Sequence, residues 1–260
     1  MNLQLKKFDP SKIADDRVCV LIGKRNTGKS FLTRHLMSFK KHIPSGVVLS
    51  GTEEGNGWYG KFVPDLFIYP DFDKEAIERV IERQRKLVKS GKKQNVFMIL
   101  DDVMYDTKNL RETCIRQIFM NGRHWGIFFM LCMQYCMDIQ PALRSNIDYV
   151  FVLRENILQN REKLWKNFFG VIPSFTMFNA IMDAVTEDFG CLVLDNTQRS
   201  NKITDCVYWY KAPPHKPFKL GSRAMWNMHK KMYNPKYDTD PQVDPKKANK
   251  KTAVTVTKKK

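Results

Sequence analysis

The sequence has no apolar run long enough to cross a membrane, and it has no apolar segment near its start. Its most apolar stretch, GIFFMLCM at Gly126–Met133, has only the length of a strand, whereas a membrane-spanning helix needs about 20 apolar residues. The opening residues, MNLQLKKFDPSKIADD, lack the apolar core of a secretory signal. We therefore expect neither a signal peptide nor a transmembrane segment.

The sequence also lacks a CxxC pair and internal repeats. Its six cysteines are scattered, and three of them lie inside strand-like apolar runs, where cysteine usually acts as a small buried hydrophobe. This pattern favours free thiols in a reducing compartment over a zinc site or a disulfide framework.

Acidic residues are scarce relative to basic ones, with 27 Asp and Glu against 44 Lys and Arg and a net charge of +17. Such a surplus favours a polyanionic partner, first of all nucleic acid. An acidic membrane surface and a merely solvated basic surface are the alternatives. A hydrophobic content of 43% is enough for a substantial core, so the composition excludes a disordered protein.

Strand-length apolar runs alternate with longer helical patterns as far as Tyr210, which predicts an α/β fold with a mostly parallel sheet and helices on both faces. The last two strands flank a polar turn and are expected to form a hairpin. The predicted strands are Arg17–Ile22, Val47–Leu49, Leu66–Tyr69, Val96–Leu100, Ile127–Met133, Tyr149–Leu153, Cys191–Leu194 and Ile203–Tyr210. The predicted helices are Lys29–Lys41, Asp73–Ser90, Asn109–Asn121 and Asn156–Phe169, with a turn or short helix at Asp138–Ser145.

The composition changes after Lys211. Residues 213–260 contain thirteen Lys or Arg and three Asp, and 13 − 3 gives +10. Prolines and the final KKANKKTAVTVTKKK are typical of an extended chain. We therefore predict one folded domain at 1–212 and a basic, largely unpacked tail at 213–260 that suits an electrostatic tether for nucleic acid.

The segment GKRNTGKS contains the full G-x-x-x-x-G-K-[ST] pattern between a predicted strand and a predicted helix. Its glycines let the backbone wrap around phosphate oxygens, so that N–H groups and the following helix N-terminus face the anion. The lysine reaches the terminal phosphates and the serine hydroxyl binds Mg²⁺. The pattern predicts a P-loop ATPase domain at 1–212. The residues expected to hold ATP are Gly23, Lys24, Arg25, Asn26, Thr27, Gly28, Lys29 and Ser30.

A second motif, VFMILDD, places two carboxylates at the end of a buried strand. Asp101 then lies beside the phosphate loop, where Mg²⁺ coordination needs a carboxylate. Asp102 could orient the attacking water or accept its proton, with Glu53 as the next candidate base. The alternative is a solvated strand end or a helix cap, because Asp is a good N-cap residue.

Three further polar residues are candidates for the catalytic site. Gln134 ends the predicted strand Ile127–Met133, at the same edge as Asp101, where its amide could contact the γ-phosphate or the water. Arg123 precedes that strand, so it lies at the opposite edge and could reach only a neighbouring subunit's nucleotide. Arg144 is a second candidate for this role. A surface glutamine and solvated arginines are the competing interpretations.

The ordered set GKRNTGKS, SGTEEGN, MILDD, NGRHWGI, LCMQ and LRSNIDYVFVLRE resembles the packaging ATPases of nucleocytoplasmic large DNA viruses, a branch of the FtsK/HerA superfamily. The resemblance runs from about Arg17 to Lys211. It implies a RecA-like P-loop NTPase core that uses ATP and Mg²⁺ to translocate double-stranded DNA. It assigns nucleotide and metal binding to Lys29 and Ser30, metal binding to Asp101, and water activation to Asp102, although cellular members usually have Glu there.

The resemblance further implies Gln134 as a sensor, Arg123 as an arginine finger, and a homo-oligomeric ring, a pentamer or a hexamer. Capsid or inner-membrane proteins of the virion are implied as further partners, and the host cytoplasm, in a virus factory, or the virion as the location. The alternatives are a related ring ATPase for recombination or segregation, a small-molecule P-loop kinase, and a basic scaffold without ATP turnover. The Ser50–Gly60 segment suits a coupling or DNA-facing loop and an ordinary surface loop equally well.

Overall fold

Nine strands form a single sheet in the computed structural model, which describes residues 3–104, 106, 108–135 and 139–235. The strand order is β1-β9-β8-β7-β2-β6-β5-β3-β4. Every neighbouring pair is parallel except the two that involve β8. The strands are β1 Lys6–Lys7, β2 Val18–Ile22, β3 Ser45–Ser50, β4 Ile68–Tyr69, β5 Val96–Asp101, β6 Ile127–Met133, β7 Tyr149–Val152, β8 Cys191–Asp195 and β9 Val207–Tyr210. The predicted mostly parallel α/β sheet is confirmed.

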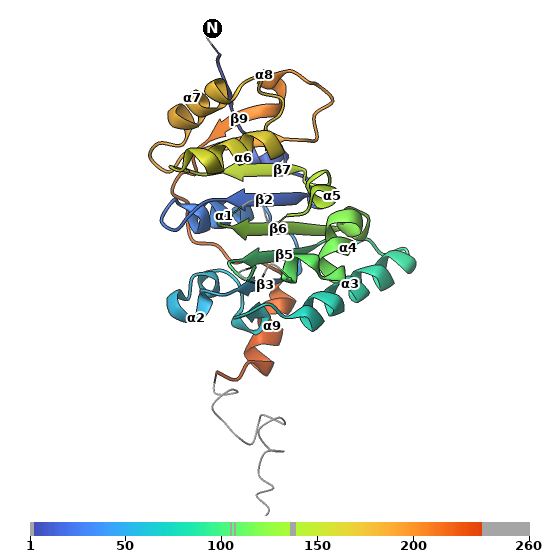
Figure 1. Ribbon diagram of the computed structural model, residues 1–260. Coiled ribbons are helices and arrows are strands. Elements are labelled where there is room, and N and C mark those ends of the chain that lie inside the picture. The colour runs from blue at the N-terminus through green and yellow to red at the C-terminus, as the bar shows by residue number, and fades with distance from the viewer. Residues whose placement is uncertain (1–2, 105, 107, 136–138, 236–260) are drawn as a thin grey trace, which may run out of the picture.

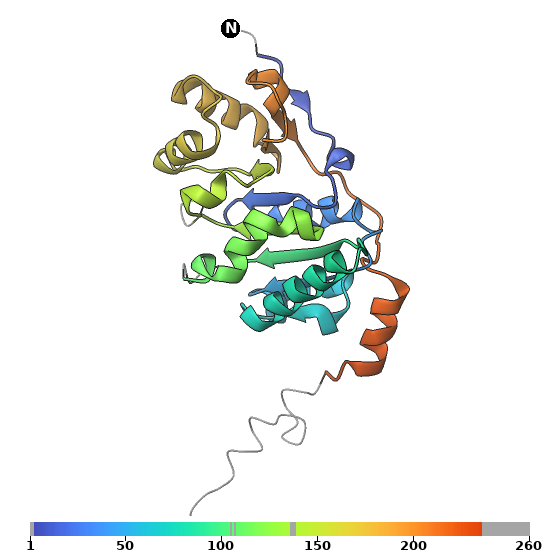
Figure 2. The same ribbon diagram turned by 90° about the vertical axis from the view of Figure 1, so that its right-hand side faces the viewer.

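Helices cover both faces of the sheet, as Figures 1 and 2 show. Alternate residues of β2 belong to two separate apolar clusters: Val20 packs with the side of α3, α4, α6 and α7, and Leu21 with the side of α1. Every residue of β2, β5 and β6 is buried, which explains their continuous apolar sequences. The helices are α1 Lys29–Ser38, α2 Glu53–Asn56, α3 Lys74–Lys89, α4 Thr113–Asn121, α5 Pro141–Arg144, α6 Leu158–Phe168, α7 Phe175–Val185, α8 Ile203–Cys206 and α9 Arg223–Met232.

The common direction of the parallel strands gives the sheet two different ends. The carboxyl edge is the end where these strands finish, on the left of Figure 1, and it holds the turn between β2 and α1. The amino edge is the end where they begin, on the right of Figure 1, and it holds α5 and the end of α4. Because β8 runs the other way, the turn between α7 and β8 also lies at the carboxyl edge.

The predicted C-terminal hairpin is confirmed in its pairing and corrected in its length. β8 and β9 pair antiparallel, with Leu194 opposite Val207. The expected strand Ile203–Tyr210 instead begins with the short helix α8, because β8 offers partners only from Val207 onward. The sequence predicted no helix at α7: FTMFNAIMDAV is a mostly apolar segment with one charge, and such a run fits a buried strand as well as a helix. Asp138 of the predicted turn at Asp138–Ser145 lies outside the described residues.

The prediction of an unpacked tail from residue 213 is wrong for residues 213–235. Leu220 is completely buried, and its N–H donates to the Phe62 carbonyl (2.8 Å). The Ser222 N–H donates to the Pro44 carbonyl (2.7 Å), and α9 then packs with Met225 in the core. The prolines and lysines suggested an unpacked chain, whereas a few apolar side chains and backbone hydrogen bonds fix this segment on the sheet. Residues 236–260 lie outside the described residues.

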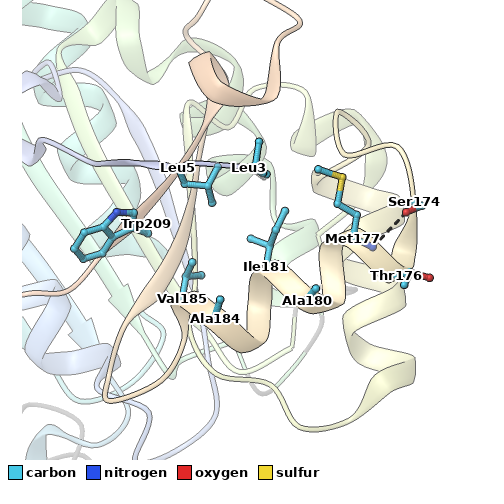
Figure 3. A pocket seen from close by; sticks show the side chains of 10 residues that line it. All are labelled: Leu3, Leu5, Ser174, Thr176, Met177, Ala180, Ile181, Ala184, Val185 and Trp209. Atoms are coloured by element: carbon cyan, nitrogen blue, oxygen red, sulfur yellow. Dashed lines mark hydrogen bonds between the residues drawn. The ribbon is translucent and has the colours of Figure 1, made fainter. Parts of the chain in front are cut away.

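An apolar groove lies at one end of the strand order, beside β9 and the N-terminal segment. Figure 3 shows it between α7 and the N-terminal segment, with Trp209 of β9 at one side. Its apolar lining includes Leu3, Leu5, Met177 and Ile181. In the described part of the chain, no helix combines the length and the apolar character needed to span a bilayer.

Candidate nucleotide-binding site

The turn between β2 and α1 is shaped to surround an anion. The Gly23 N–H donates to the Met133 carbonyl of β6 (3.1 Å), which fixes the start of the turn. The Thr27 hydroxyl donates to the Lys24 carbonyl (2.8 Å) inside it. Gly28, at the start of α1, has φ +92°, a left-handed conformation that favours glycine. The backbone N–H groups that follow therefore face a common centre.

A cavity of about 330 Å³ opens at this turn on the carboxyl edge. It brings together six of the eight predicted phosphate-loop residues and both predicted acids, while Gly23 and Thr27 shape the loop behind it. The predicted residues that line it are Lys24, Arg25, Asn26, Gly28, Lys29, Ser30, Asp101 and Asp102. A cavity with this charge distribution can hold a triphosphate beside a divalent cation.

Asp101 is a buried carboxylate at the end of β5. Its side chain is 3% exposed, and the Tyr59 hydroxyl donates to its Oδ2 (2.8 Å). Burial raises the pKa of Asp101, while the nearby Lys29 ammonium and the Tyr59 hydrogen bond oppose that rise. A buried carboxylate that is short of positive charge favours binding of a cation.

Asp102 occupies a strained position between the lysine and the glutamine. Its φ is +56°, which is uncommon for a residue other than glycine. Its Oδ1 lies 3.8 Å from Lys29 Nζ, and Gln134 Nε2 lies 3.0 Å from each of its carboxylate oxygens. The structure thus brings Lys29, Asp102 and Gln134 together, in an arrangement that can orient a small polar molecule above the cavity.

The Ser50–Gly60 segment borders this cavity and was only partly understood from sequence. Thr52 and Asn56 line the cavity, and Tyr59 reaches Asp101. The carboxylate of Glu53 accepts the N–H groups of Tyr59 (2.9 Å) and Gly60 (2.8 Å). Glu53 is the alternative candidate base, and both of its carboxylate oxygens accept hydrogen bonds from the backbone that positions Tyr59.

Glu155 is a further acidic residue of the site, at the end of the motif LRSNIDYVFVLRE, and the sequence assigned it no role. It is 7% exposed, lies just beyond β7, and pairs with Lys24 (2.6 Å). It also accepts the Ile157 N–H (2.8 Å) and a hydrogen bond from Asn160 (3.1 Å). These bonds lower its pKa against the opposing effect of burial. Glu155 thus ties the phosphate loop to the start of α6, and only the three-dimensional neighbourhood identifies it.

Two exposed aromatic residues adjoin the loop. Phe31 is 38% exposed and lines the cavity one residue after Ser30. Phe189 is 64% exposed, and a Cβ placed on Gly28 would lie 3.2 Å from its ring. Asp188 and Phe189 both have positive φ, +48° and +61°, so the turn that presents Phe189 is strained. Sequence alone gave no signal for a contact between residues so far apart.

The structure does not bring Arg123 or Arg144 to the phosphate loop of their own chain. Both precede strands that run toward the cavity, so both lie at the amino edge. Arg123 is exposed, whereas Arg144 is partly buried and donates to Asn167 Oδ1. This placement agrees with the expected position of Arg123 at the edge opposite its own nucleotide.

The chain resembles known proteins in sequence and in fold, although no protein-family model matches it. It is 37% identical over 247 residues to an uncharacterized protein of Acanthamoeba polyphaga mimivirus. The alignment covers 91% of this chain and 87% of the relative. It is 41% identical over 214 residues to an uncharacterized protein of Frog virus 3, covering 80% of this chain and 66% of the relative.

A solved structure shows the same fold at low identity. The genome packaging NTPase of Sulfolobus turreted icosahedral virus 2 in complex with ATP-gammaS aligns with a TM-score of 0.54 and 18% identity. The alignment covers 79% of this chain and all of that one.

The parallel sheet, the turn between β2 and α1 and the acids that end β5 together define the P-loop NTPase fold. At the identities and coverage found, the chain belongs to the same family as the mimivirus protein, a family with members in large DNA viruses.

Proposed function

We propose that this protein is an ATPase that drives double-stranded DNA into a viral capsid. The observation that carries the proposal is the convergence of Lys29, Asp101 and Asp102 on one cavity beside the phosphate loop. Lys29 is only 8% exposed, so its ammonium is held where the terminal phosphates would lie. A fixed cation in a poorly hydrated site stabilises the charge that develops during phosphoryl transfer.

The oxygen ligands of the cavity fit Mg²⁺. The Ser30 hydroxyl and the buried Asp101 carboxylate are hard donors on its wall. When bound, Mg²⁺ would neutralise charge on the phosphate oxygens. Tyr59 holds the Asp101 carboxylate in one orientation.

Asp102 and Gln134 are the residues proposed to position the attacking water. The two hydrogen bonds from Gln134 fix the Asp102 carboxylate, which can then accept the proton of a water near the γ-phosphate. Asp102 is shorter than the Glu usual in cellular FtsK/HerA members, and its left-handed backbone changes where the carboxylate lies.

The DNA-translocating role is supported by charge and by relatives. The net charge of +17 suits a phosphate backbone. Relatives occur in Frog virus 3 and mimivirus, and the solved structure with the same fold is described as a genome packaging NTPase. Membership of the FtsK/HerA superfamily is part of this proposal, as is action in the host cytoplasm or the virion. Capsid or inner-membrane proteins of the virion are the proposed further partners.

The proposed assembly is a homo-oligomeric ring, a pentamer or a hexamer, in which Arg123 of one subunit completes its neighbour's site. Its place at the amino edge suits contact with the carboxyl edge of the next copy. Arg144 is the weaker candidate, because its guanidinium already bonds Asn167 within the chain.

The proposed domain boundary moves to residue 235. Residues 3–235 form the ATPase domain, apart from the short undescribed gaps, and residues 236–260 form a basic tether for DNA. Removing residues 236–260 should leave basal ATP turnover intact. If about five tail cations touch phosphates, the slope of log affinity for DNA against log salt should shrink by about 4.5. An unchanged slope would assign the tail to another partner.

The deciding experiment measures ATP turnover with and without double-stranded DNA, on protein sized by light scattering. We expect DNA to stimulate turnover and Lys29→Ala to abolish it, because the phosphates lose their fixed cation. An absence of turnover in the wild-type protein under both conditions would contradict the proposal and favour a basic scaffold with a nucleotide fold.

A further inference from the structure

We infer that α9, the segment before it and the turn at residues 58–61 form one surface that binds the phosphate backbone of duplex DNA. This surface, the cationic track, consists of five cations and three aromatic rings. The cations are Arg34, Lys61, Lys219, Arg223 and Lys230, and the rings are those of Trp58, Phe218 and Trp226. The inference rests on the proposed function and deepens it by naming where the folded domain holds DNA.

Two cations share the ring of Trp58 at one end of the track. Lys61 Nζ lies 5.0 Å from the centre of this ring, and Arg34 Cζ lies 5.6 Å from it. Arg34 Cζ is also 6.0 Å from the ring centre of Phe218, so the same contacts continue onto the segment before α9. Aromatic rings hold cations by their electron-rich faces, and two positive charges held this close together attract an anion.

Lys219 continues the track onto α9. Its Nζ lies 4.6 Å from the ring centre of Trp226, and Trp226 Nε1 donates to the Leu220 carbonyl (2.9 Å). Arg223 and Lys230 lie three residues before and four residues after Trp226, so the helical spacing places both beside its ring. Both side chains are exposed. The stripe that they form is about 10 Å long, which matches about three base pairs of a duplex.

Helix α9 is fixed to the domain, so its cations are presented in one arrangement. Met225 is buried on the inward side of the helix. His229 Nδ1 accepts the Leu66 N–H (3.3 Å), and the Ser222 N–H at the start of the helix donates to the Pro44 carbonyl (2.7 Å). Figure 2 shows α9, in orange-red, at the margin of the molecule. A long polymer can therefore pass along this helix.

The charge around the track is positive even when every neighbouring acid is counted. Together with Arg34, residues 53–67 and 213–235 contain seven Lys or Arg and three acids, and 7 − 3 gives +4. Glu53 accepts two backbone N–H groups, and Asp65 Oδ1 would lie 2.7 Å from a Cβ placed on Gly60, so it faces that backbone. Glu54 is exposed on α2. Among the described residues, no carboxylate forms an ion pair with any cation of the track.

The arrangement of α9 favours DNA over an acidic membrane surface. A helix that lies on a membrane inserts an apolar face between its cations. On α9, Met228 and Met232 are exposed, at 46% and 63%, but at 100° per residue they lie on the side of the helix opposite Arg223 and Lys230. A flat bilayer cannot contact both sides at once, whereas phosphates require only the cations.

The track is connected to the nucleotide site through two segments. Arg34 lies on α1, the helix that follows the phosphate loop. The Trp58 N–H donates to Asn56 Oδ1 (3.0 Å), and Asn56 lines the nucleotide cavity. Tyr59, the next residue, donates to the carboxylate of Asp101. DNA on the track therefore contacts the same turn that positions this carboxylate, which gives DNA a physical connection to ATP turnover.

The test removes two cations of the track and two matched cations elsewhere. Arg223→Ala/Lys230→Ala removes the stripe on α9, and the variant should fold because alanine favours a helix. The matched control, Arg199→Ala/Lys202→Ala, also removes one arginine and one lysine. Both control residues are exposed and lie between β8 and α8, at the other end of the strand order. Arg223→Lys/Lys230→Arg exchanges the side chains of the stripe and keeps both charges.

The affinity of the full chain for a labelled duplex is measured by fluorescence anisotropy over a range of salt concentrations. For Arg223→Ala/Lys230→Ala, we expect the dissociation constant to rise at least about tenfold at about 0.1 M salt. The slope of log affinity against log salt should shrink by about 1.8, since each lost phosphate contact removes about 0.9. The control and the charge-preserving variant should match the wild type. ATP turnover without DNA should stay unchanged, while the DNA concentration for half-maximal stimulation rises.

The outcomes separate the track from the proposed enzyme. Unchanged DNA affinity and slope in Arg223→Ala/Lys230→Ala, beside DNA-stimulated turnover in the wild type, would overturn the track and leave the ATPase intact. A wild-type protein that hydrolyses ATP without binding duplex DNA would overturn the track and the DNA-translocating role together. Cosedimentation with vesicles of phosphatidylserine and phosphatidylcholine covers the membrane alternative. If the variant loses vesicle binding and keeps DNA binding, the cations of α9 serve a membrane and the inference is wrong.

Discussion

The two edges of the sheet are built from the same strands, yet they differ in chemistry. At the carboxyl edge, buried strands end in polar residues that converge on one cavity, as Asp101 and Ser50 do at neighbouring positions of β5 and β3. At the amino edge, Arg123 and the cations before β5 are exposed and line no cavity comparable to the nucleotide site, although Arg123 is close enough to Asp148 to affect its pKa. The carboxyl edge thus gathers its polar residues within one chain, whereas a role for the amino edge in the proposed ring requires a second subunit.

Each edge also has an acid that holds local structure, and their environments are opposite. Glu155 receives a lysine and two hydrogen bonds, which lower its pKa. Asp148 accepts the Val18 N–H (2.9 Å) and pairs with Arg17 (3.5 Å), yet burial dominates and raises its pKa. The surroundings of Glu155 therefore favour its charged form, and those of Asp148 disfavour it. The contrast belongs to these two residues, because the pKa of Asp101 at the carboxyl edge is also raised.

The largest expected effect tests whether the amino edge acts in trans. Arg123→Ala should bind ATP normally and lose about 10³–10⁵ in turnover, the range for arginine fingers. Turnover and nucleotide binding are measured separately on sized oligomers. Arg144→Ala is the matched control at the same edge and should retain turnover.

Mixing gives the decisive observation for Arg123. Mixed rings of Arg123→Ala and Lys29→Ala subunits, each inactive alone, should regain part of the turnover, because some interfaces pair an intact loop with an intact arginine. If demonstrably mixed rings stay inactive, Arg123 does not act in trans. If Arg123→Ala is active, and turnover instead returns in mixed rings of Arg144→Ala and Lys29→Ala subunits, the arginine finger is Arg144.

The next largest effect tests the separate roles proposed for Asp102 and Gln134 at the carboxyl edge. Asp102→Asn should keep ATP bound while hydrolysis falls by about 10²–10⁴, because the side chain can still bond Gln134 but can no longer accept a proton. Single-turnover hydrolysis and ATP affinity are the measurements. Gln134→Ala should lower hydrolysis less, since it positions Asp102 and does not take the proton. Normal turnover in Asp102→Asn would place the base elsewhere.

The sequence predicted which residues line the cavity at the carboxyl edge because most of them belong to two short contiguous motifs. GKRNTGKS predicts a turn whose backbone is shaped to surround phosphate, and MILDD ends a strand predicted to be central because the residues before its acids, VFMIL, are all apolar. Glu155, Tyr59 and Phe189 escaped prediction because each acts through a residue distant in the chain: Lys24, Asp101 and Gly28. No local pattern encodes such contacts.

The prediction of an unpacked C-terminal segment was wrong for a different reason. Residues 213–235 contain four lysines and four prolines among 23 residues, but one buried residue such as Leu220 can hold a segment in place. Truncating a fully buried leucine typically costs about 2–5 kcal/mol. The average composition of a segment does not reveal a single buried residue. It therefore predicted an unpacked tail where the structure has a packed segment followed by helix α9.

A smaller effect compares the two structural acids. Glu155→Gln should lower the free energy of unfolding at neutral pH by about 1–2 kcal/mol, because hydrogen bonds to a charged acceptor are lost or weakened. Asp148→Asn should cost little at neutral pH, since an amide oxygen can still accept the Val18 N–H. The measurement is urea denaturation over a range of pH, with ATP affinity alongside; only Glu155→Gln should weaken ATP binding.

The pH dependence of this pair has opposite signs. The pKa of Glu155 is lowered from its usual 4.5, so its stabilisation is lost as the pH falls below that value, and Glu155→Gln should flatten the acid-side decline. The pKa of Asp148 is raised from 3.8, so its contribution improves as the pH falls, and Asp148→Asn should steepen the net decline. Equal slopes in the two variants would contradict the proposed difference between Glu155 and Asp148.

The smallest expected effect concerns Tyr59, whose hydroxyl is the one described side-chain donor to Asp101. Tyr59→Phe keeps the ring in its buried place and removes only that donor, at a cost to stability of about 1 kcal/mol. Since the hydrogen bond favours the charged carboxylate, its loss should raise the pKa of Asp101 further. Protons then compete with Mg²⁺ up to a higher pH, so the Mg²⁺ concentration for half-maximal turnover should rise on the acid side and converge with wild type as the pH increases. Tyr69→Phe, at a tyrosine of β4 away from the cavity, should leave the whole profile unchanged. A Mg²⁺ requirement that shifts equally at every pH would show that Tyr59 shapes the cavity without tuning the Asp101 carboxylate.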